Sequence, residues 1–149
     1  MNKNVKKLLG KRFISGSWGE LWWDGEKILE VSKFEAKVTA EREDVNQGGT
    51  LDVDSKLVGL KGEGSFTIKK VYSRTLKKLV ESWKQGIDPR SKLITKLHDP
   101  DSFGAERVVL NNVWFIDGTI MNFESKKLIE EELKFGFTPS DVEFQELIA

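Results

Sequence analysis

SRTLKKLVESWKQG, residues 73–86, decides the fold, because it is the one stretch of the chain with a clear helical period. Ser73 can accept a backbone hydrogen bond as the N-cap, and Gly86 suits the left-handed residue that ends a helix. The apolar residues have the i, i+3, i+4, i+7 spacing of a single helical face: Leu76, Leu79, Val80 and Trp83. This spacing predicts one amphipathic helix that lays its apolar face on a β-sheet.

Every other segment with a clear period alternates in twos, which is the period of a β-strand. The dipeptides Asp24-Gly25 and Asp117-Gly118 predict tight hairpin turns, and Asn111-Asn112 predicts a bulge. We therefore expect a mainly β fold, an antiparallel β-barrel or sandwich with one flanking helix. The expected strands cover residues 17–23, 27–31, 34–41, 62–71, 92–98, 106–117, 119–125 and 132–137.

The remaining segments have no strand or helix period. At 149 residues the chain is expected to form a single domain, 1–149. Residues 1–15 are rich in lysine and are expected to be a flexible N-terminal arm. Residues 42–61 contain Gly48-Gly49 and apolar groups without an obvious place in a core, which predicts a long interaction loop that folds against a neighbouring subunit. Residues 138–149 are expected to be a short acidic C-terminal tail.

Composition excludes several classes of protein. The sequence has 24 basic and 24 acidic residues, a balance that argues against a general nucleic-acid binder. It has no cysteine, so it can form neither a disulfide framework nor a cysteine-based zinc site, and a cytosolic origin is the simpler interpretation. No apolar run approaches the roughly 20 residues of a membrane span, and the first residues do not resemble a signal peptide.

Charge is unevenly distributed along the chain. Five basic residues and no acid precede Glu20, whereas acids outnumber lysines from Glu124 to the end. Such ends are usually solvated surface. Alternatively, a basic end of one copy meets an acidic end of another, and a head-to-tail contact of this kind produces a ring or a filament.

Catalytic residues are scarce. His98 is the only histidine, which leaves almost no material for a Ser-His-Asp triad or a two-histidine metal site. Asp99 and Asp101 follow the pattern of a turn rather than of a glycosidase dyad. The acids of residues 44–54 lack the spacing of a calcium loop, and the glycines match no phosphate-binding motif. We therefore expect no enzymatic activity, no cofactor and no metal.

The tryptophans near the N-terminus allow two interpretations. Trp22 and Trp23 are adjacent, so in a strand they point to opposite faces. One is expected in the core, and the other is expected to be exposed or to lie in a subunit interface, where tryptophan is enriched. A platform that stacks on sugar rings or bases, with Trp18, is the alternative.

The order of these segments resembles the tail tube proteins of contractile phages and of phage-like particles of the PBSX type. The resemblance runs from about Ser15 to Leu147. Its most specific parts are the W-D-G hairpin of 16–25, F-E-A-K-V at 34–38, G-x-G-S-F-T-I-x-K-V from 62, S-R-T-L from 73, G-x-D-P at 86–89, A-E-R-V-V-L-N-N-V-x-F at 105–115, and the segment 131–137.

The resemblance implies a non-enzymatic structural protein. Members of that family form hexameric rings that stack into the inner tube of a contractile tail, with a fold similar to the tube protein of type VI secretion. The implied partners are further copies of the chain, a tail sheath protein, a baseplate or initiator and a tail terminator. The lumen passes DNA in a phage or ions in a tail-like bacteriocin. The implied location is a virion tail or phage-like particle, assembled in the bacterial cytoplasm without insertion into a membrane.

Two sets of residues are expected to serve the assembly. The polar residues of the strand 34–41 are expected to face a water-filled lumen: Glu35, Lys37, Thr39 and Glu41. The expected contacts between subunits or rings lie in the arm, the first tryptophan pair, the long loop and the tail: Lys3, Lys6, Lys7, Lys11, Arg12, Trp22, Asp44, Gly48, Gly49, Leu51, Asp52, Leu57, Asp141 and Glu143. The alternative is a monomeric β-barrel that binds a ligand or nucleic acid.

Overall fold

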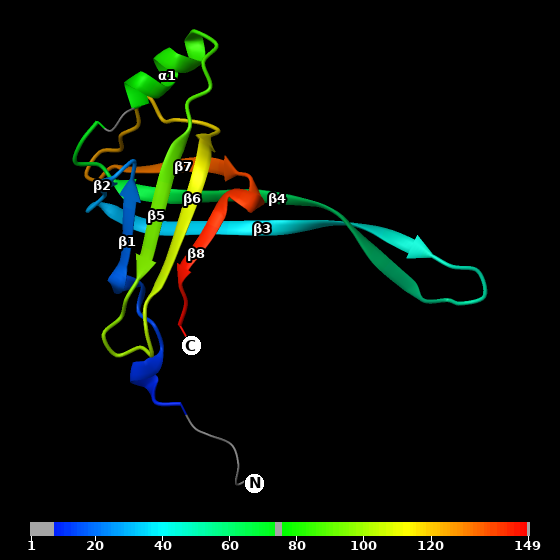
Figure 1. Cartoon of the computed structure of the whole chain (residues 1–149). Helices are drawn as coiled ribbons and strands as arrows, with labels where there is room; N and C mark the ends of the chain where they lie inside the picture. The colour runs from blue at the N-terminus through cyan, green and yellow to red at the C-terminus, as the bar shows by residue number, and fades with distance from the viewer. Residues whose placement is uncertain (1–7, 74–75, 149) are drawn as a thin grey trace.

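Antiparallel strands dominate the computed structural model, which describes residues 8–73 and 76–148 (Figure 1). This confirms the predicted mainly β fold. The elements, in chain order, are η1 (Gly10–Arg12), η2 (Gly16–Trp18), β1 (Gly19–Trp23), β2 (Glu26–Lys27), β3 (Val31–Asn46), β4 (Val53–Lys69), α1 (Leu76–Lys84), β5 (Ser91–Leu97), β6 (Glu106–Phe115), β7 (Glu130–Phe137), η3 (Pro139–Asp141) and β8 (Val142–Glu146).

The strands form two sheets that share β6. The strand order is β2-β1-β5-β6-β7-β4-β3, and β8 also pairs with β6. Residues 106–113 of β6 pair with β5 and residues 107–110 pair with β8, whereas Trp114 and Phe115 pair with β7. The predicted bulge lies between Leu110 and Val113, where Asn112 has a φ of 54°. We call β2, β1, β5, β6 and β8 the β5 sheet, and β3, β4, β7 and the end of β6 the β4 sheet. Figure 1 shows that their strands cross at a steep angle.

Aromatic side chains join the two sheets. Trp23 of β1 lies 4.9 Å from Phe115 of β6 and 5.8 Å from Phe66 of β4, measured between ring centroids. Phe66 in turn lies 6.2 Å from Phe135 of β7. All four residues are buried, so this cluster links the sheets through a dry aromatic core. Trp22 points to the opposite face and is only partly buried, which confirms the expected division between the two tryptophans.

Two glycines of β4 make room for rings of β7. Gly64 pairs with Phe135 and Gly62 with Phe137. A Cβ atom at Gly62 would lie 2.6 Å from Cδ2 and Cε2 of Phe137, and one at Gly64 would lie 2.9 Å from Cε2 of Phe135. The two rings therefore occupy the space of the missing side chains, an arrangement that lets aromatic residues cover glycine backbone in a sheet.

The predicted helix is present and ends as expected. Gly86 has a φ of 74°, its N–H donates to the Trp83 carbonyl at 3.0 Å, and the N–H of Ile87 donates to the Ser82 carbonyl at 2.9 Å. This is the Schellman hydrogen-bond pattern. The predicted N-cap at Ser73 is separated from the start of the helix at Leu76 by residues 74–75, which lie outside the described residues.

The position of the helix differs from the prediction. Leu79 is buried and Trp83 packs against the core, so the apolar face is the expected one. However, Figure 1 places α1 beyond the ends of β5 and β6, not across the face of a sheet. The strands supply almost all of the core, so the helix covers one end of the fold and is not its organising element.

The expected loop of residues 42–61 is wrong, because most of it belongs to the paired strands β3 and β4. The register runs from Phe34 opposite Phe66 to Asn46 opposite Val53, with an irregularity between Glu41 and Arg42. Only residues 47–52 connect the strands. Strict alternation of apolar and polar residues is missing here for a physical reason. Cross-strand hydrogen bonds form this ladder, and no apolar face is turned to the core, so the sequence does not need to alternate.

Three other boundaries also differ from expectation. Residues 119–125 form no strand, and Gly118 makes no hairpin turn. The chain passes close to α1 at Gly118 instead, since a Cβ atom at Gly118 would collide with Cδ1 of Leu76. The C-terminal tail contains η3 and β8, which pairs with β6. The described part of the arm, from residue 8, contains η1. The longest strands are β3 and β4, not the expected 106–117.

The glycine–aromatic packing predicts a specific loss of stability. We expect Gly64→Val to lower the free energy of unfolding by about 1–3 kcal/mol, because the new side chain overpacks the Phe135 ring. Ser65→Val is the matched control, since the next residue of β4 points to the opposite face. Urea denaturation of both variants tests the prediction, and equal losses would contradict it.

Candidate functional site

The polar face of the β4 sheet is the first candidate surface. The four residues expected at the lumen, Glu35, Lys37, Thr39 and Glu41, are all exposed and share this face of β3. Acids and bases also alternate between the strands. Lys37 lies opposite Glu63, with 4.0 Å between the charged atoms.

This alternation continues on β7. Glu35 lies opposite Ser65, which in turn lies opposite Lys134. The next row runs from Lys33 through Thr67 to Glu132. The surface is therefore hydrated and carries mixed charge, and it offers no patch of one sign to hold a polyanion.

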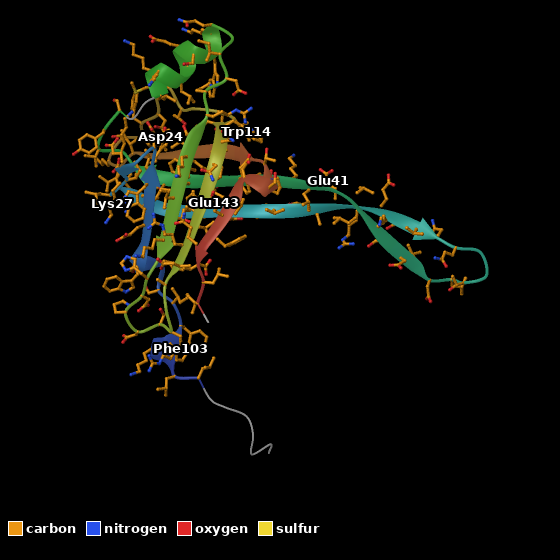
Figure 2. All side chains as sticks on the ribbon, in the orientation of Figure 1. Asp24, Lys27, Glu41, Phe103, Trp114 and Glu143 are labelled. Carbon is orange, nitrogen blue, oxygen red and sulfur yellow. The ribbon has the colours of Figure 1, made fainter. Side chains whose placement is uncertain are left out.

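The far half of the β3–β4 hairpin is the second candidate surface. Beyond Glu41 the two strands leave the rest of the molecule, and their side chains extend into the open on both sides (Figure 2). Leu51 at the tip is fully exposed, and four other apolar side chains of this far half are exposed as well: Val45, Val53, Leu57 and Val58. An isolated two-stranded hairpin is only marginally stable in water, and exposed apolar surface of this extent marks a contact site.

The predicted contact residues are spread over three places. The hairpin brings six of them together: Asp44, Gly48, Gly49, Leu51, Asp52 and Leu57. Trp22 and Glu143 lie at the two ends of one row of paired residues on the outer face of the β5 sheet. This row runs from Trp22 through Ile94 and Val109 to Glu143. Asp141 lies in η3 nearby, and its backbone carbonyl accepts a hydrogen bond from Asn111.

The N-terminal arm is fastened to the turn of residues 99–104. The Arg12 guanidinium donates to the Asp101 carbonyl at 3.1 Å and lies 5.0 Å from the centroid of the Phe103 ring. The N–H of Ser15 donates to a carboxylate oxygen of Asp99 at 2.9 Å, and this bond, with a second one from the Asp101 N–H, lowers the pKa of Asp99. Lys11 lies in η1, whereas Lys3, Lys6 and Lys7 lie outside the described residues.

The described part of the N-terminal arm and the last described residue lie near the same turn. Ile148 is near Gly104, in the turn that holds Arg12.

Glu20, Lys27 and His98 form the one ion-pair cluster of the described residues that involves histidine. A carboxylate oxygen of Glu20 accepts from His98 Nε2 at 2.9 Å and from Lys27 Nζ at 3.2 Å. These bonds, with that from His98 the larger, lower the pKa of Glu20. Trp18 packs edge-on against His98, with 6.1 Å between the ring centroids. The cluster fastens η2 and β1 to the end of β5 and presents no nucleophile.

An apolar groove lies between the two sheets. It has a volume of about 840 Å³ and is open to solvent. One wall is the edge of β3 over residues 31–38, and the other consists of apolar residues of the β5 sheet: Leu21, Leu97, Val108, Leu110, Val142 and Phe144. This groove was not predicted, because its residues come from strands that are distant along the chain.

Within the described residues, no group of three or more histidine, aspartate or glutamate side chains is placed to hold a metal ion. No helix in the same part of the chain is long and apolar enough to cross a bilayer.

Comparison with known proteins identifies relatives over nearly the whole chain. A family model described as "Phage tail tube protein" matches residues 6–146. The chain is also 34% identical over 137 residues to the "Phage-like element PBSX protein XkdM" of Bacillus subtilis (strain 168), a match that covers 91% of this chain and 93% of that protein.

Solved structures share the fold at low sequence identity. A chain from the sheath-tube complex of an extracellular contractile injection system, PVC, superposes with a TM-score of 0.67 at 10% identity, covering 93% of this chain and 95% of the other. Hcp1 from Flavobacterium johnsoniae superposes with a TM-score of 0.54 at 13% identity, covering 89% of this chain and 95% of the other. The Hcp-like tail tube fold expected from the sequence is therefore confirmed.

The Glu20 cluster predicts a pH-dependent contribution to stability. A carboxylate whose pKa is lowered on folding stabilises the protein above its unfolded pKa, and this contribution is lost as the pH falls through the folded value. We expect Glu20→Gln to cost up to about 1 kcal/mol near pH 6 and progressively less as the pH falls below the ordinary pKa of 4.5. Urea denaturation between pH 6 and about 3, with Glu132→Gln on the exposed face of β7 as control, measures the difference. A cost that is independent of pH would contradict the prediction.

Proposed function

Because this chain belongs to the phage tail tube protein family, we propose that it assembles, as a single tail tube domain, into stacked hexameric rings. Tail tube proteins are structural, and the chain is not an enzyme.

One observation carries the proposed assembly. The far half of the β3–β4 hairpin exposes apolar side chains on a ribbon with no partner in the described residues. In a stack of rings, other copies would cover this ribbon.

The proposed lumen wall is the polar face of the β4 sheet. A ring of such sheets would present the alternating acids and bases of β3, β4 and β7 to water. Mixed charge suits a conduit, because a wall rich in lysine and arginine would hold the phosphate backbone instead of letting it pass. The tube would conduct DNA in a phage tail, or ions in a tail-like bacteriocin.

The proposed partners follow from the relatives. One structure with the same fold comes from a sheath-tube complex, and others come from a tube-terminating cap and from a baseplate. We propose that a sheath protein surrounds this tube, that a baseplate or initiator starts it and that a terminator ends it. The location would be the tail of a virion or a phage-like particle, assembled in the bacterial cytoplasm.

Electron microscopy of the purified chain over a series of concentrations, with light scattering, tests the assembly. We expect rings and hollow tubes with sixfold symmetry. A protein that stays monomeric at every concentration, even with an initiator complex added, would contradict the proposal and favour a monomeric ligand-binding barrel.

The hairpin gives a sharper form of this test. Glu43 and Lys56 are register partners, so replacing residues 44–55 by Asn-Gly closes the ladder with a two-residue turn. We expect this variant to form rings but no long tubes, because the contact surface between rings is lost. Lys78→Ser on the exposed face of α1 is the control. Tubes of normal length from the shortened protein would contradict a role of the hairpin in ring stacking.

The lumen assignment predicts a gain of DNA binding. Glu35→Lys with Glu41→Lys makes the proposed wall basic, and assembled tubes of this variant should retain DNA with a strong salt dependence. Glu81→Lys with Glu124→Lys adds the same charge at exposed positions off this face. Equal retention by both variants, measured by co-sedimentation, would overturn the lumen assignment.

A further inference from the structure

We propose that residues 119–123 of one copy form a strand along the free edge of β3 of the next copy in a ring and fill the apolar groove beneath it. The inference rests on the proposed ring assembly and names the two surfaces that meet between neighbouring subunits.

The groove has the form of a site for an extended segment. β3 pairs with β4 along one edge only, and no strand of the described residues pairs with its other edge. That unpaired edge forms one wall of the groove over residues 31–38, and apolar side chains form the opposite wall. Backbone groups beside an apolar trough recognise an extended chain, because the ladder supplies the hydrogen bonds while alternate side chains enter the trough.

Residues 119–123 have the matching properties. Their N–H groups donate to no backbone acceptor in the described part of the chain. Ile120, Met121 and Phe123 are between 69% and 80% exposed. The alternation of the sequence predicts a strand here, yet the molecule offers it no strand partner. Paired with β3, the segment would place Met121 and Phe123 on one face, the face that an apolar groove accepts.

The occupant must come from a second copy. Gly118 lies against Leu76 of α1, and the Asn122 side-chain amide donates to the Glu130 carbonyl at 3.0 Å. These contacts hold the segment at the α1 end of its own molecule, away from the groove (Figure 1). Two other segments with exposed apolar side chains are engaged within their own molecule. The hairpin strands pair with each other, and the N-terminal arm is held by the turn of residues 99–104.

Disulfide trapping tests the contact, because the natural chain has no cysteine. One cysteine replaces Asn122, and a second replaces Lys33, Glu35, Lys37 or Thr39 in turn along β3. Assembled particles are checked by electron microscopy, oxidised and separated on a denaturing gel. Asn122→Cys with Glu63→Cys is the matched control, since Glu63 shares the polar face but lies one strand further in.

We expect at least one β3 position to give a ladder of covalent oligomers up to the hexamer, with the control mostly monomeric. Assembled particles that give no ladder at any β3 position would overturn the inference and leave the proposed function standing. A ladder of equal strength from the control would also overturn it. Failure of the natural chain to assemble would overturn the proposed function and this inference together.

Discussion

The structure depends on the packing of aromatic rings between two crossed sheets. Trp23 comes from the β5 sheet, Phe66 and Phe135 come from the β4 sheet, and Phe115 comes from the end of β6 that pairs with β7. Rings of this size close the gap between the sheets, but only because β4 carries glycine opposite Phe135 and Phe137. The constraint is local. It fixes the half of the β3–β4 hairpin that crosses the core and leaves the far half without any packing partner.

Sequence reasoning succeeded wherever the local pattern and the core agreed. Asp24 and Gly25 both have positive φ, as the hairpin turn requires, and the helix ends at Gly86. Residues 62–71 and 132–137 alternate as strands with one buried face do, and Phe66, Ile68, Leu133 and Phe135 are buried. In each case a buried face imposes a period on the sequence, and this period predicts the secondary structure.

The failures share a different cause. In residues 42–61 neither face is buried, so nothing in this chain forces alternation, although the backbone ladder is continuous. At Asp117-Gly118 the same dipeptide signal that marks the first hairpin marks a close approach to Leu76 instead. The groove between the sheets was not predicted, because β3, β5 and β8 are distant along the chain. The packing of the two sheets brings them to the same groove. The predicted contact residues come mainly from charged and glycine-rich segments. Exposed apolar side chains also occur in residues 119–125, for which the sequence predicts a strand: Ile120, Met121 and Phe123.

A monomer with these surfaces faces a conflict between assembly and aggregation. An unpaired strand edge beside exposed apolar groups is a general hazard, because any chain of similar character can pair with it. Closed assembly resolves the conflict. A heterologous contact repeated around a ring uses each edge once and leaves none free, whereas a contact that fails to close grows into irregular fibres. In the proposed ring, the segment that pairs with β3, residues 119–123, carries no charged side chain. The mixed charges on the polar face of β3 would therefore stay in contact with water and would not be taken up by the contact between copies.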